Sequence, residues 1–282
     1  MNIGEINTKW TKLLTAAYGE DEAKAIVREA IALYLDMSPV DIVLRRDFEP
    51  ASATIRLLED ALSRVMAGEP IQYILGESWF HGLKISVSPA VLIPRKETSQ
   101  LVDIIIAQWK DRTDLSVADI CCGSGAIACA LSRALPFSSV TGVDISPSAI
   151  EISKTNAAKL KCNINWLIAD ILNPAFTLDG KFDIIVSNPP YIPFKEKNLV
   201  DDNVLRYEPH QALFVPDSDP LIFYKAIGKW ALNHLAEGGI LYFEINPGYA
   251  DSLSQLLTSI GYRDVNILKD FTGKNRFATA CL

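Results

Sequence analysis

The sequence predicts an α/β fold: a doubly wound, mostly parallel sheet of seven strands, preceded by a small helical domain. Strand-like and helix-like runs alternate from about residue 98 to the end, as in parallel strands joined by crossover helices. The last two strand-like runs have no helix between them, so we expect an antiparallel edge hairpin. Before residue 70 the apolar residues recur only at helical spacing.

Composition narrows the class of protein. A chain of 282 residues with 49% hydrophobic residues suits one large and one small domain. No apolar run reaches the roughly 18 residues of a membrane span, and the N-terminus lacks a signal-peptide pattern, so we expect a soluble, cytoplasmic protein without membrane contacts. Five cysteines without paired spacing are expected to be reduced thiols, and three scattered histidines indicate no metal site. The net charge of −7 disfavours direct nucleic-acid binding, and a monomer is the expected state.

The helical domain is predicted over residues 1–70. Apolar side chains form one stripe in DEAKAIVREAIALYL and another in ATIRLLEDALSRVMAGEP. The stripes consist of Ala23, Ile26, Val27, Ala30, Ile31 and Tyr34, and of Ile55, Leu58, Leu62 and Val65. A connector over residues 71–97 follows, in which apolar residues alternate around a hairpin turn at His81-Gly82.

The third region, residues 98–282, begins with a helix in SQLVDIIIAQWK and continues with seven predicted strands. These are placed at 116–121, 139–144, 165–169, 182–187, 240–245, 262–268 and 276–281. Ser146 and Pro147 are expected to begin the helix after the second strand, as N-cap and first helical residue.

A glycine loop follows the first of these strands, in VADICCGSGAIACALS. Gly123 and Gly125 allow the backbone to approach a ligand closely, and the helix that starts near Gly125 offers free N–H groups. Asp144 ends the next strand, where a carboxylate accepts hydrogen bonds from both hydroxyls of a ribose. These residues predict a site for a nucleoside-type cofactor.

The loop alone leaves the cofactor open. Gly123-x-Gly125-x-x-Ala128 also satisfies the dinucleotide fingerprint, so a nicotinamide or flavin dinucleotide competes with S-adenosylmethionine, and a turn without a ligand is the third alternative. Asp119, at the end of the preceding strand, favours S-adenosylmethionine. A carboxylate there would repel a pyrophosphate and attract a sulfonium and an amino group.

The segment SNPPYIPF follows the fourth strand and therefore lies at the same sheet edge. Pro189 and Pro190 fix the backbone and have no N–H, so the Asn188 side-chain oxygen and the Pro189 carbonyl are expected to face one NH₂ group. Tyr191 is placed to contact a planar substrate. The simpler alternative is a proline-rich turn that only ends a strand.

Such an edge suits methyl transfer to an amide or exocyclic amine nitrogen. Positive charge develops on that nitrogen as the methyl group arrives, and two fixed acceptors on its hydrogens stabilise this charge most in the transition state. A strong general base is not required, because the alkylated nitrogen loses its proton readily.

The order ADICCGSGAIA, VDIS, AD and VSNPPYIP resembles the S-adenosylmethionine-dependent methyltransferases. The segments PIQYILGESWFHGLKISVSPAVLIPRKET, YEPHQAL, GGILYFEI and KDFTGKNRFATA are similar to the release-factor glutamine methyltransferases of the HemK/PrmC type. Together these segments and the helical domain cover nearly the whole chain.

The resemblance implies a Rossmann-like methyltransferase domain over residues 98–282, which transfers a methyl group from S-adenosylmethionine to the side-chain nitrogen (N5) of the glutamine in the Gly-Gly-Gln motif of peptide-chain release factors. The helical domain would help to recognise that protein substrate, and no metal is implied. The cofactor residues would be Cys121, Cys122, Gly123, Ser124 and Gly125 for the methionine part, Asp144 for the ribose, Ile171 near the adenine, and Asn188. Asn188, Pro189, Pro190 and Tyr191 would bind the glutamine, with Asn188, Pro189 and Tyr191 acting in catalysis.

Several positions depart from the family pattern. Cys121 stands where glycine is usual, Ile171 where an aromatic residue is frequent, and Lys96 and Ser99 replace proline and glutamate in RKETSQ. We interpret the neighbouring Arg95, Glu97 and Thr98 as structural residues of the connector. The Asn-Pro-Pro-Tyr motif is shared with adenine-N6 and guanine-N2 methyltransferases, so a nucleic-acid enzyme is one competing hypothesis. A non-catalytic cofactor-binding interaction module is the other.

Overall fold

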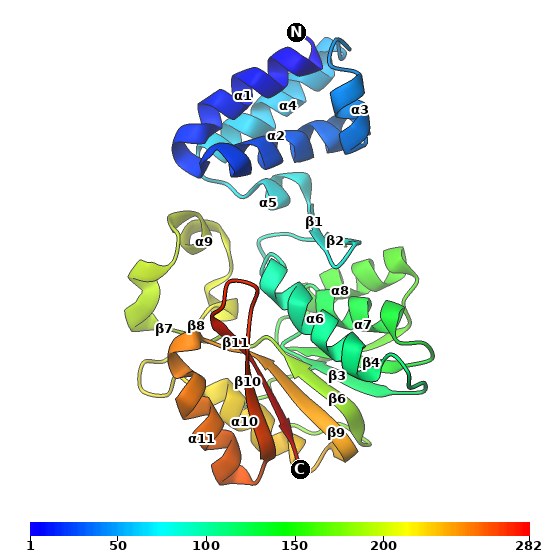
Figure 1. The fold of residues 1–282 in the computed structure, drawn as a ribbon, viewed down its shortest axis with the longest axis vertical. Helices are drawn as coiled ribbons and strands as arrows, with labels where there is room; N and C mark the ends of the chain where they lie inside the picture. Colours follow the sequence, from blue (N-terminus) through cyan, green and yellow to red (C-terminus); the bar gives the residue numbers. More distant parts are fainter. The chain divides into compact units, whose positions relative to one another are not determined.

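The computed structural model describes all 282 residues, and the chain divides into two compact units. The first unit comprises Met1–Gly76 together with Asp202–Tyr207, and the second comprises Glu77–Asp201 together with Glu208–Leu282. Figure 1 shows the elements of both units along the chain. None of the helices combines the length and the apolar character needed to cross a membrane.

The first unit is entirely helical. Its helices are α1 (Ile3–Tyr18), α2 (Glu20–Leu35), α3 (Pro39–Leu44), α4 (Ser52–Met66), α5 (Ile71–Leu75) and α9 (Asp202–Tyr207). Two of them begin with a capping box, in which a side-chain oxygen of the N-cap and a carboxylate three residues later satisfy each other's backbone N–H. Asn2 and Glu5 form this box for α1, and Ser38 and Asp41 form it for α3.

The predicted apolar stripes form the core of this unit. All members of the α2 stripe except the half-buried Tyr34 are buried, as are Leu58, Leu62 and Val65 on α4. Trp10 and Leu14 of α1 pack into the same cluster. The unit extends through α5 to Gly76, beyond the expected end at residue 70, and it includes α9 from a distant part of the chain. No helical stripe in the sequence marks α9 as a partner of this core.

The second unit is built on the predicted seven-stranded sheet. Its strands are β3 (Ser116–Ile120), β4 (Ser139–Asp144), β5 (Ile164–Ile168), β6 (Phe182–Ser187), β9 (Leu235–Glu244), β10 (Arg263–Lys269) and β11 (Asn275–Cys281), in the order β10-β11-β9-β6-β3-β4-β5. β11 is antiparallel to both of its neighbours, and the remaining pairs are parallel. The edge hairpin and the mostly parallel sheet are therefore confirmed.

One strand differs from its expected bounds by more than one residue. β9 starts at Leu235, whereas the sequence suggested a start at residue 240. Leu235 pairs with Phe182 and Ile240 pairs with Ile184, so the residues between Leu235 and Ile240 form an irregularity within the strand. Gly238 and Gly239 lie in this irregularity, and glycines are the usual sign of a turn, which explains why the sequence pattern indicated a later start.

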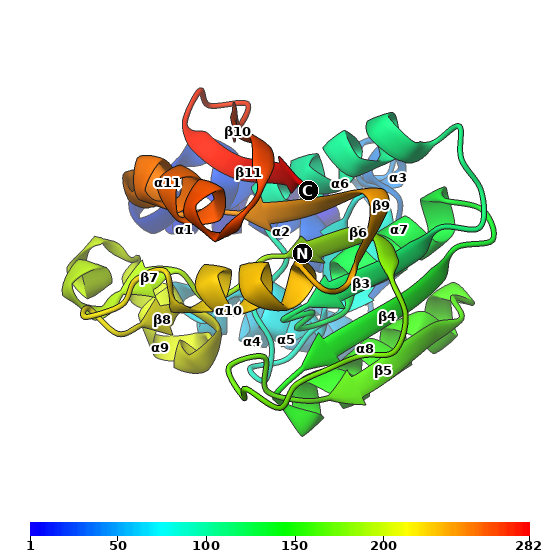
Figure 2. The same ribbon diagram turned by 90° about the horizontal axis from the view of Figure 1, so that it is seen from below.

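Helices cover both faces of the sheet (Figures 1 and 2). α6 (Lys96–Trp109), α7 (Ala126–Ala134) and α8 (Pro147–Leu160) pack side by side on one face, and α10 (Ile222–Ala231) and α11 (Ala250–Ile260) pack together on the other. Ser146 caps α8, and Pro147 is its first residue, as expected. Lys96 is the first residue of α6, a position at which proline is favoured.

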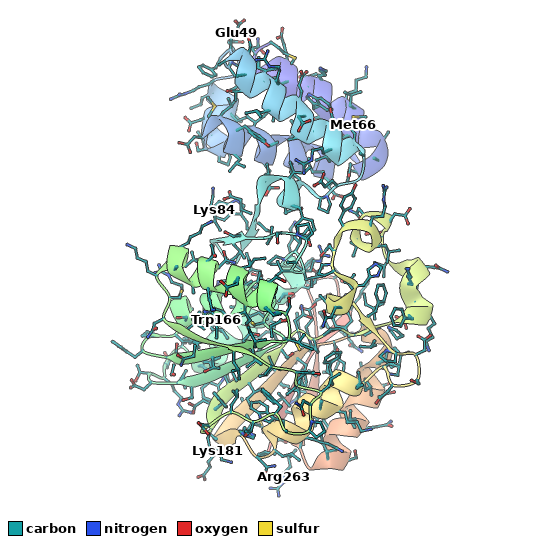
Figure 3. The ribbon with its side chains drawn as sticks, turned by 180° about the vertical axis from the view of Figure 1, so that it is seen from behind. Glu49, Met66, Lys84, Trp166, Lys181 and Arg263 are labelled. Carbon is teal, nitrogen blue, oxygen red and sulfur yellow. The ribbon has the colours of Figure 1, made fainter.

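Short elements complete the second unit. β1 (Glu77–Phe80) and β2 (Leu83–Ser86) pair as a hairpin around His81-Gly82. β7 (Ile192–Pro193) pairs with β8 (Phe214–Val215), and η1 (Phe194–Leu199), η2 (His210–Ala212) and η3 (Pro247–Tyr249) are 3₁₀ turns. Figure 3 shows Lys181 and Arg263, which mark the amino ends of β6 and β10. The carboxyl ends of the parallel strands lie at the opposite edge of the sheet.

Candidate active site

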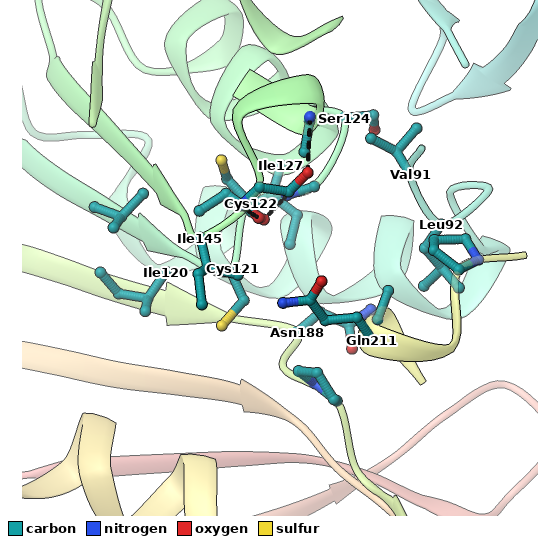
Figure 4. A pocket seen from close by; sticks show the side chains of 18 of the residues that line it. Val91, Leu92, Ile120, Cys121, Cys122, Ser124, Ile127, Ile145, Asn188 and Gln211 are labelled. Atoms are coloured by element: carbon teal, nitrogen blue, oxygen red, sulfur yellow. Dashed lines mark hydrogen bonds between the residues drawn. The ribbon is translucent and has the colours of Figure 1, made fainter. Parts of the chain in front are cut away.

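A pocket lies at the carboxyl edge of the sheet, where β3, β4, β5 and β6 end. Much of its lining directly follows these strands: 121–124, 145–146, 169–172, Asn188 and Pro190. Other lining residues come from the connector and from the segment before β8, and include Val91, Leu92, Pro94, Arg95, Pro209, Gln211 and Ala212. Figure 4 shows Cys121, Ser124, Asn188 and Gln211 around this space. Parallel α/β sheets bind ligands at this edge, so we take the pocket as the candidate active site.

The structure brings most of the predicted site residues to this pocket. Cys121, Cys122, Gly123, Ser124, Asp144, Ile171, Asn188 and Pro190 all line it. Gly125, Pro189 and Tyr191 are neighbours of lining residues in the chain but do not line the pocket themselves.

The glycine loop, residues 121–125, owes its shape to its backbone. Cys121, Gly123 and Gly125 have φ of 63°, 54° and 72°, a region that favours glycine. A Cβ at Gly125 would also lie 2.6 Å from Cη2 of Trp166, whereas nothing lies within 4 Å of a Cβ at Gly123. Gly125 is therefore required by packing as well as by conformation.

Cys121 has the left-handed backbone that explains why glycine is usual at this position. A residue with a Cβ loses about 1 kcal/mol or more in this conformation. The Cys121 side chain lines the pocket, as Figure 4 shows. Burial raises the pKa of its thiol, so the side chain stays protonated at neutral pH and acts as a small apolar wall.

Helix α8 holds the glycine loop through two polar side chains. Ser153 Oγ donates to the Gly123 carbonyl at 2.8 Å, and Asn156 Nδ2 donates to the Ser124 carbonyl at 2.9 Å. The same Asn156 amide bonds both the carbonyl and the N–H of Ser86 on β2, at 3.0 and 2.7 Å. Both α8 side chains are fully buried. No local pattern in the sequence marks these two residues, because only the fold brings them to the loop.

Asp144 joins the end of β4 to the glycine loop. Its Oδ2 accepts from the Gly123 N–H at 2.8 Å and its Oδ1 from the Ser146 N–H at 2.9 Å. Burial raises the pKa of Asp144, while these backbone hydrogen bonds lower it. These two hydrogen bonds hold the carboxylate rigidly at the pocket wall. Each oxygen keeps a further lone pair with which it can accept a hydrogen bond from a ligand.

Asp119 does not take the place that the sequence suggested. It is fully buried and does not line the pocket; its Oδ2 accepts from the Ala128 N–H in the first turn of α7 at 3.0 Å. Burial raises the pKa of Asp119 to about 8, with the charge of Asp144 adding to the rise. The carboxyl group is thus largely neutral at pH 7, and the expected negative charge beside the ligand is mostly missing.

The wall after β4 and β5 is largely apolar. Ile145, Ala169, Ile171 and Leu172 line it, with Ile171 buried and Ile145 exposed. Asp170 lies within this wall, and its Oδ1 accepts from the Leu172 N–H at 2.8 Å. An apolar slot with a few polar atoms at its rim suits the flat ring of a nucleoside.

The segment after β6 is fixed by side chains rather than by its backbone alone. Asn188 Nδ2 donates to Thr98 Oγ1 at 3.1 Å, and the Tyr191 hydroxyl donates to Glu244 Oε1 at 3.2 Å. The Tyr191 ring packs against the sheet core, and burial raises the pKa of its hydroxyl. Pro189 and Pro190 are both buried.

Thr98 and Glu244 were not identified as site residues by the sequence analysis. Thr98, interpreted as structural, lines the pocket and donates to Glu244 Oε2 at 2.6 Å. Glu244, the last residue of β9, is buried. The one available signal was a glutamate at the end of an apolar strand, in GGILYFEI, since a carboxyl group is rarely buried without partners.

Arg95 also lines the pocket, although we interpreted it as structural. Its guanidinium forms an ion pair with Glu208, whose other carboxylate oxygen accepts from the Ile93 N–H at 3.1 Å. The Glu208 side chain is almost fully buried. This pair joins the connector to the segment that contributes Pro209 and Gln211, so it holds two parts of the pocket wall together.

Two family models match the chain: the PrmC N-terminal domain over residues 5–76 and the methyltransferase small domain over residues 96–207. Among solved structures, a methyltransferase from Pyrococcus furiosus aligns with a TM-score of 0.51 and 18% identity, covering 79% of this chain and 97% of that one. At this identity the likeness concerns the fold alone.

Relatives of known family cover almost the whole chain. A release factor glutamine methyltransferase of Bacteroides thetaiotaomicron is 40% identical over 93% of this chain and 94% of its own length. One from Flavobacterium psychrophilum is 36% identical over 98% of both chains. With both domains matched and identity at this level along the full length, the chain belongs to the release factor glutamine methyltransferase family.

Proposed function

We propose that this protein transfers a methyl group from S-adenosylmethionine to N5 of the glutamine side chain in the Gly-Gly-Gln motif of peptide-chain release factors. The observation that carries the proposal is the position of Asn188. It lies at the end of β6, beside the strand that ends in the glycine loop, and both line one pocket. The family to which the chain belongs supports a release factor as the substrate.

The pocket fits the proposed cofactor. Asp144 keeps free acceptor positions that would bind the two ribose hydroxyls. The apolar wall around Ile171 would accommodate the adenine ring, and the loop from Cys121 to Gly125 would border the methionine part. The bound cofactor supplies a methyl group on a sulfonium. The chain's own task is to hold the acceptor nitrogen in line with that group.

The proposed acceptor is an amide nitrogen, a poor nucleophile because its lone pair is delocalised. Asn188 Oδ1 would accept from one of its two hydrogens, and the carbonyl of Pro189, which lies between two pocket-lining residues in the chain, would accept from the other. Positive charge develops on the nitrogen during transfer, so these acceptors bind the transition state more strongly than the ground state. Pro190 and Tyr191 would fix the backbone on which the acceptors stand. The chemistry needs no general base, which agrees with the neutral character of Cys121.

The helical first unit is proposed to recognise the protein substrate. Support comes from the match to the PrmC N-terminal domain, which accounts for nearly all of the unit's continuous part, and from relatives that align over the full chain.

The test is methylation of a purified release factor with labelled S-adenosylmethionine. We expect label on the Gly-Gly-Gln glutamine and none on a release factor in which this glutamine is replaced by alanine. Labelled RNA and DNA serve as parallel substrates, and transfer to either in preference to the release factor would favour the nucleic-acid alternative. Absence of transfer by a folded enzyme that binds the cofactor would contradict the proposal.

Asn188→Ala tests the proposed mechanism. We expect turnover to fall by about 100-fold, the scale of one preorganised polar contact, with cofactor affinity largely kept. Calorimetry measures the affinity and single-turnover labelling the rate. Unchanged turnover in this variant would remove Asn188 from the mechanism.

A further inference from the structure

The side-chain amide of Asn188 has two ends of almost equal size and opposite chemistry. If the oxygen faces the pocket, it accepts from a substrate NH₂ group; if the nitrogen faces it, two N–H donors meet two N–H donors and repel. In the structure, Asn188 Nδ2 donates to Thr98, and no group of the protein donates a hydrogen bond to Asn188 Oδ1. Something must therefore hold the amide in this one orientation.

The Thr98 hydroxyl can hold it only if its own hydrogen points elsewhere. A hydroxyl both donates and accepts, so a free threonine would tolerate either end of the amide. Here the hydroxyl donates to Glu244 Oε2 at 2.6 Å, which leaves only lone pairs for Asn188. A lone pair of the Thr98 hydroxyl oxygen accepts from Asn188 Nδ2 and would repel Asn188 Oδ1. The direction of this series of hydrogen bonds is therefore fixed by Glu244, at its other end.

Glu244 is placed to keep this direction. Its other oxygen accepts from the Tyr191 hydroxyl, so both carboxylate oxygens face hydroxyl donors. Burial raises the pKa of Glu244, while the hydrogen bond from Thr98, the charge of Arg276 and the hydrogen bond from Tyr191 lower it. With both oxygens accepting, Glu244 draws the hydrogen of the Thr98 hydroxyl away from Asn188. Both partners are nearly inaccessible to water, with exposed fractions of 5% for Thr98 and 2% for Glu244.

We propose that Thr98 and Glu244 are positioning residues that determine which end of the Asn188 amide faces the pocket. This inference rests on the proposed function, because it assigns Oδ1 to the substrate nitrogen. Neither residue needs to touch the substrate. They act through Asn188, from a helix and a strand far from it in sequence.

The fold provides a matched control for this arrangement. Trp109 Nε1 donates to the Tyr242 hydroxyl at 2.8 Å, a buried hydrogen bond that also joins α6 to β9. Thr98→Val removes the hydroxyl that orients Asn188 and keeps the shape of the side chain. Tyr242→Phe removes a comparable link between the same two elements without affecting Asn188. If Thr98 orients Asn188, only Thr98→Val should lower turnover. If Thr98 only joins α6 to β9, the two variants should have similar effects.

We expect Thr98→Val to lower kcat about tenfold, the equivalent of one neutral hydrogen bond, with cofactor affinity within twofold of wild type. Thr98→Ser, which keeps the hydroxyl, should restore kcat to within about threefold, and Tyr242→Phe should lower thermal stability without changing kcat. Wild-type kcat in Thr98→Val would overturn the proposal. So would an equal loss in Thr98→Ser or in Tyr242→Phe, because either result would point to packing.

Glu244→Gln is the second variant if Thr98→Val does not fold. Its amide has nearly the same shape but allows an NH₂ group to face Thr98, which lets the chain of hydrogen bonds reverse. We expect a kcat several-fold below wild type with cofactor affinity kept. A kcat equal to wild type would contradict the proposal.

A measurement on Asn188 itself separates this inference from the proposed function. In the wild type and in Thr98→Ser, nuclear Overhauser effects should connect the Asn188 NH₂ protons to the methyl or methylene protons of residue 98. In Thr98→Val these effects should weaken as the amide turns. Equal effects in all three proteins would overturn the inference even in an active enzyme. A wild type that methylates no release factor would overturn the proposed function, while this measurement would still decide the orientation.

Discussion

The glycine loop after β3 and the segment from Asn188 to Tyr191 after β6 follow neighbouring strands, yet they are held in different ways. The loop takes its shape from its own residues with positive φ, and its backbone groups are bonded by the side chains of Asp144, Ser153 and Asn156. The Asn188 segment depends on side chains of Thr98 and Glu244, which belong to distant parts of the chain. A surface that must fit a ligand closely is thus built from backbone groups with a fixed conformation. An acceptor side chain that must point one way is oriented by other side chains.

The largest effect should come from the glycine loop. Gly125→Ala should lower the free energy of unfolding by about 2–4 kcal/mol, because left-handed strain and overpacking against Trp166 add together. Gly123→Ala should cost only about 1 kcal/mol, since its Cβ meets open space. Urea unfolding measures both. Equal losses would mean that Trp166 moves aside freely, and that the loop is less closely packed than the structure indicates.

Asp144→Asn should show that the glycine loop affects cofactor affinity, whereas the Asn188 segment affects turnover. An amide has one acceptor oxygen, so its NH₂ end would face one of the two backbone N–H groups that now bond Asp144. We expect cofactor affinity to fall about 10- to 100-fold, as for the loss of hydrogen bonds to a charged group. The rate at saturating cofactor should change far less than in Asn188→Ala. If both variants lost only turnover, the division of roles between the two regions would be wrong.

Asp119→Asn should change how stability depends on pH. The pKa of Asp119 is raised to about 8, so the folded protein keeps a proton that the unfolded chain releases above about pH 4. Wild-type stability should therefore decline between these values, by up to about 1.4 kcal/mol per pH unit from this group, and level off above pH 8. The variant has no titrating group at position 119 and should not show this decline. Parallel stability profiles for the two proteins between pH 5 and 8 would contradict the assignment.

The smallest effect should come from the helix that contains Thr98. Lys96 is the first residue of α6, and Arg95 before it is extended, with φ −94° and ψ 155°. The extended backbone of Arg95 and the first helical position of Lys96 both suit proline at position 96. Lys96→Pro should therefore raise the free energy of unfolding by about 0.4–1 kcal/mol without changing turnover. Lys96→Ala, which keeps the backbone N–H, should change stability less. A loss of turnover in Lys96→Pro alone would show that Thr98 had shifted.

Much of the architecture could be predicted from the sequence, because it rests on local patterns. Apolar periodicity located the strands, and the Ser146-Pro147 pair marked the start of α8. Two features differ in the structure from what their sequence patterns indicate. Gly238 and Gly239 looked like a turn but lie within β9, and Asp119 looked like a charged ligand contact but is buried. A glycine can lie in a turn or within a strand, and an aspartate can face a ligand or be buried. In both cases the tertiary environment determines which of the two occurs.

The remaining parts of the site depend on pairs of residues far apart in the chain. Thr98 and Glu244 meet only because α6 packs against β9, and Asn156 reaches the glycine loop only because α8 packs beside it. A single sequence shows the members of such pairs but not the pairing. The position of α9 also depends on residues far away in the chain, and nothing near residues 202–207 indicates that they pack with the N-terminal helices.

The grouping of α9 with the first five helices also determines when that unit can be completed during synthesis. A ribosome has made most of the second unit's parallel strands before it reaches Tyr207. The N-terminal helices therefore emerge first but gain their last element late, and a fragment that stops at Gly76 would lack it. Such a fragment should fold with lower stability than the same helices in the full chain.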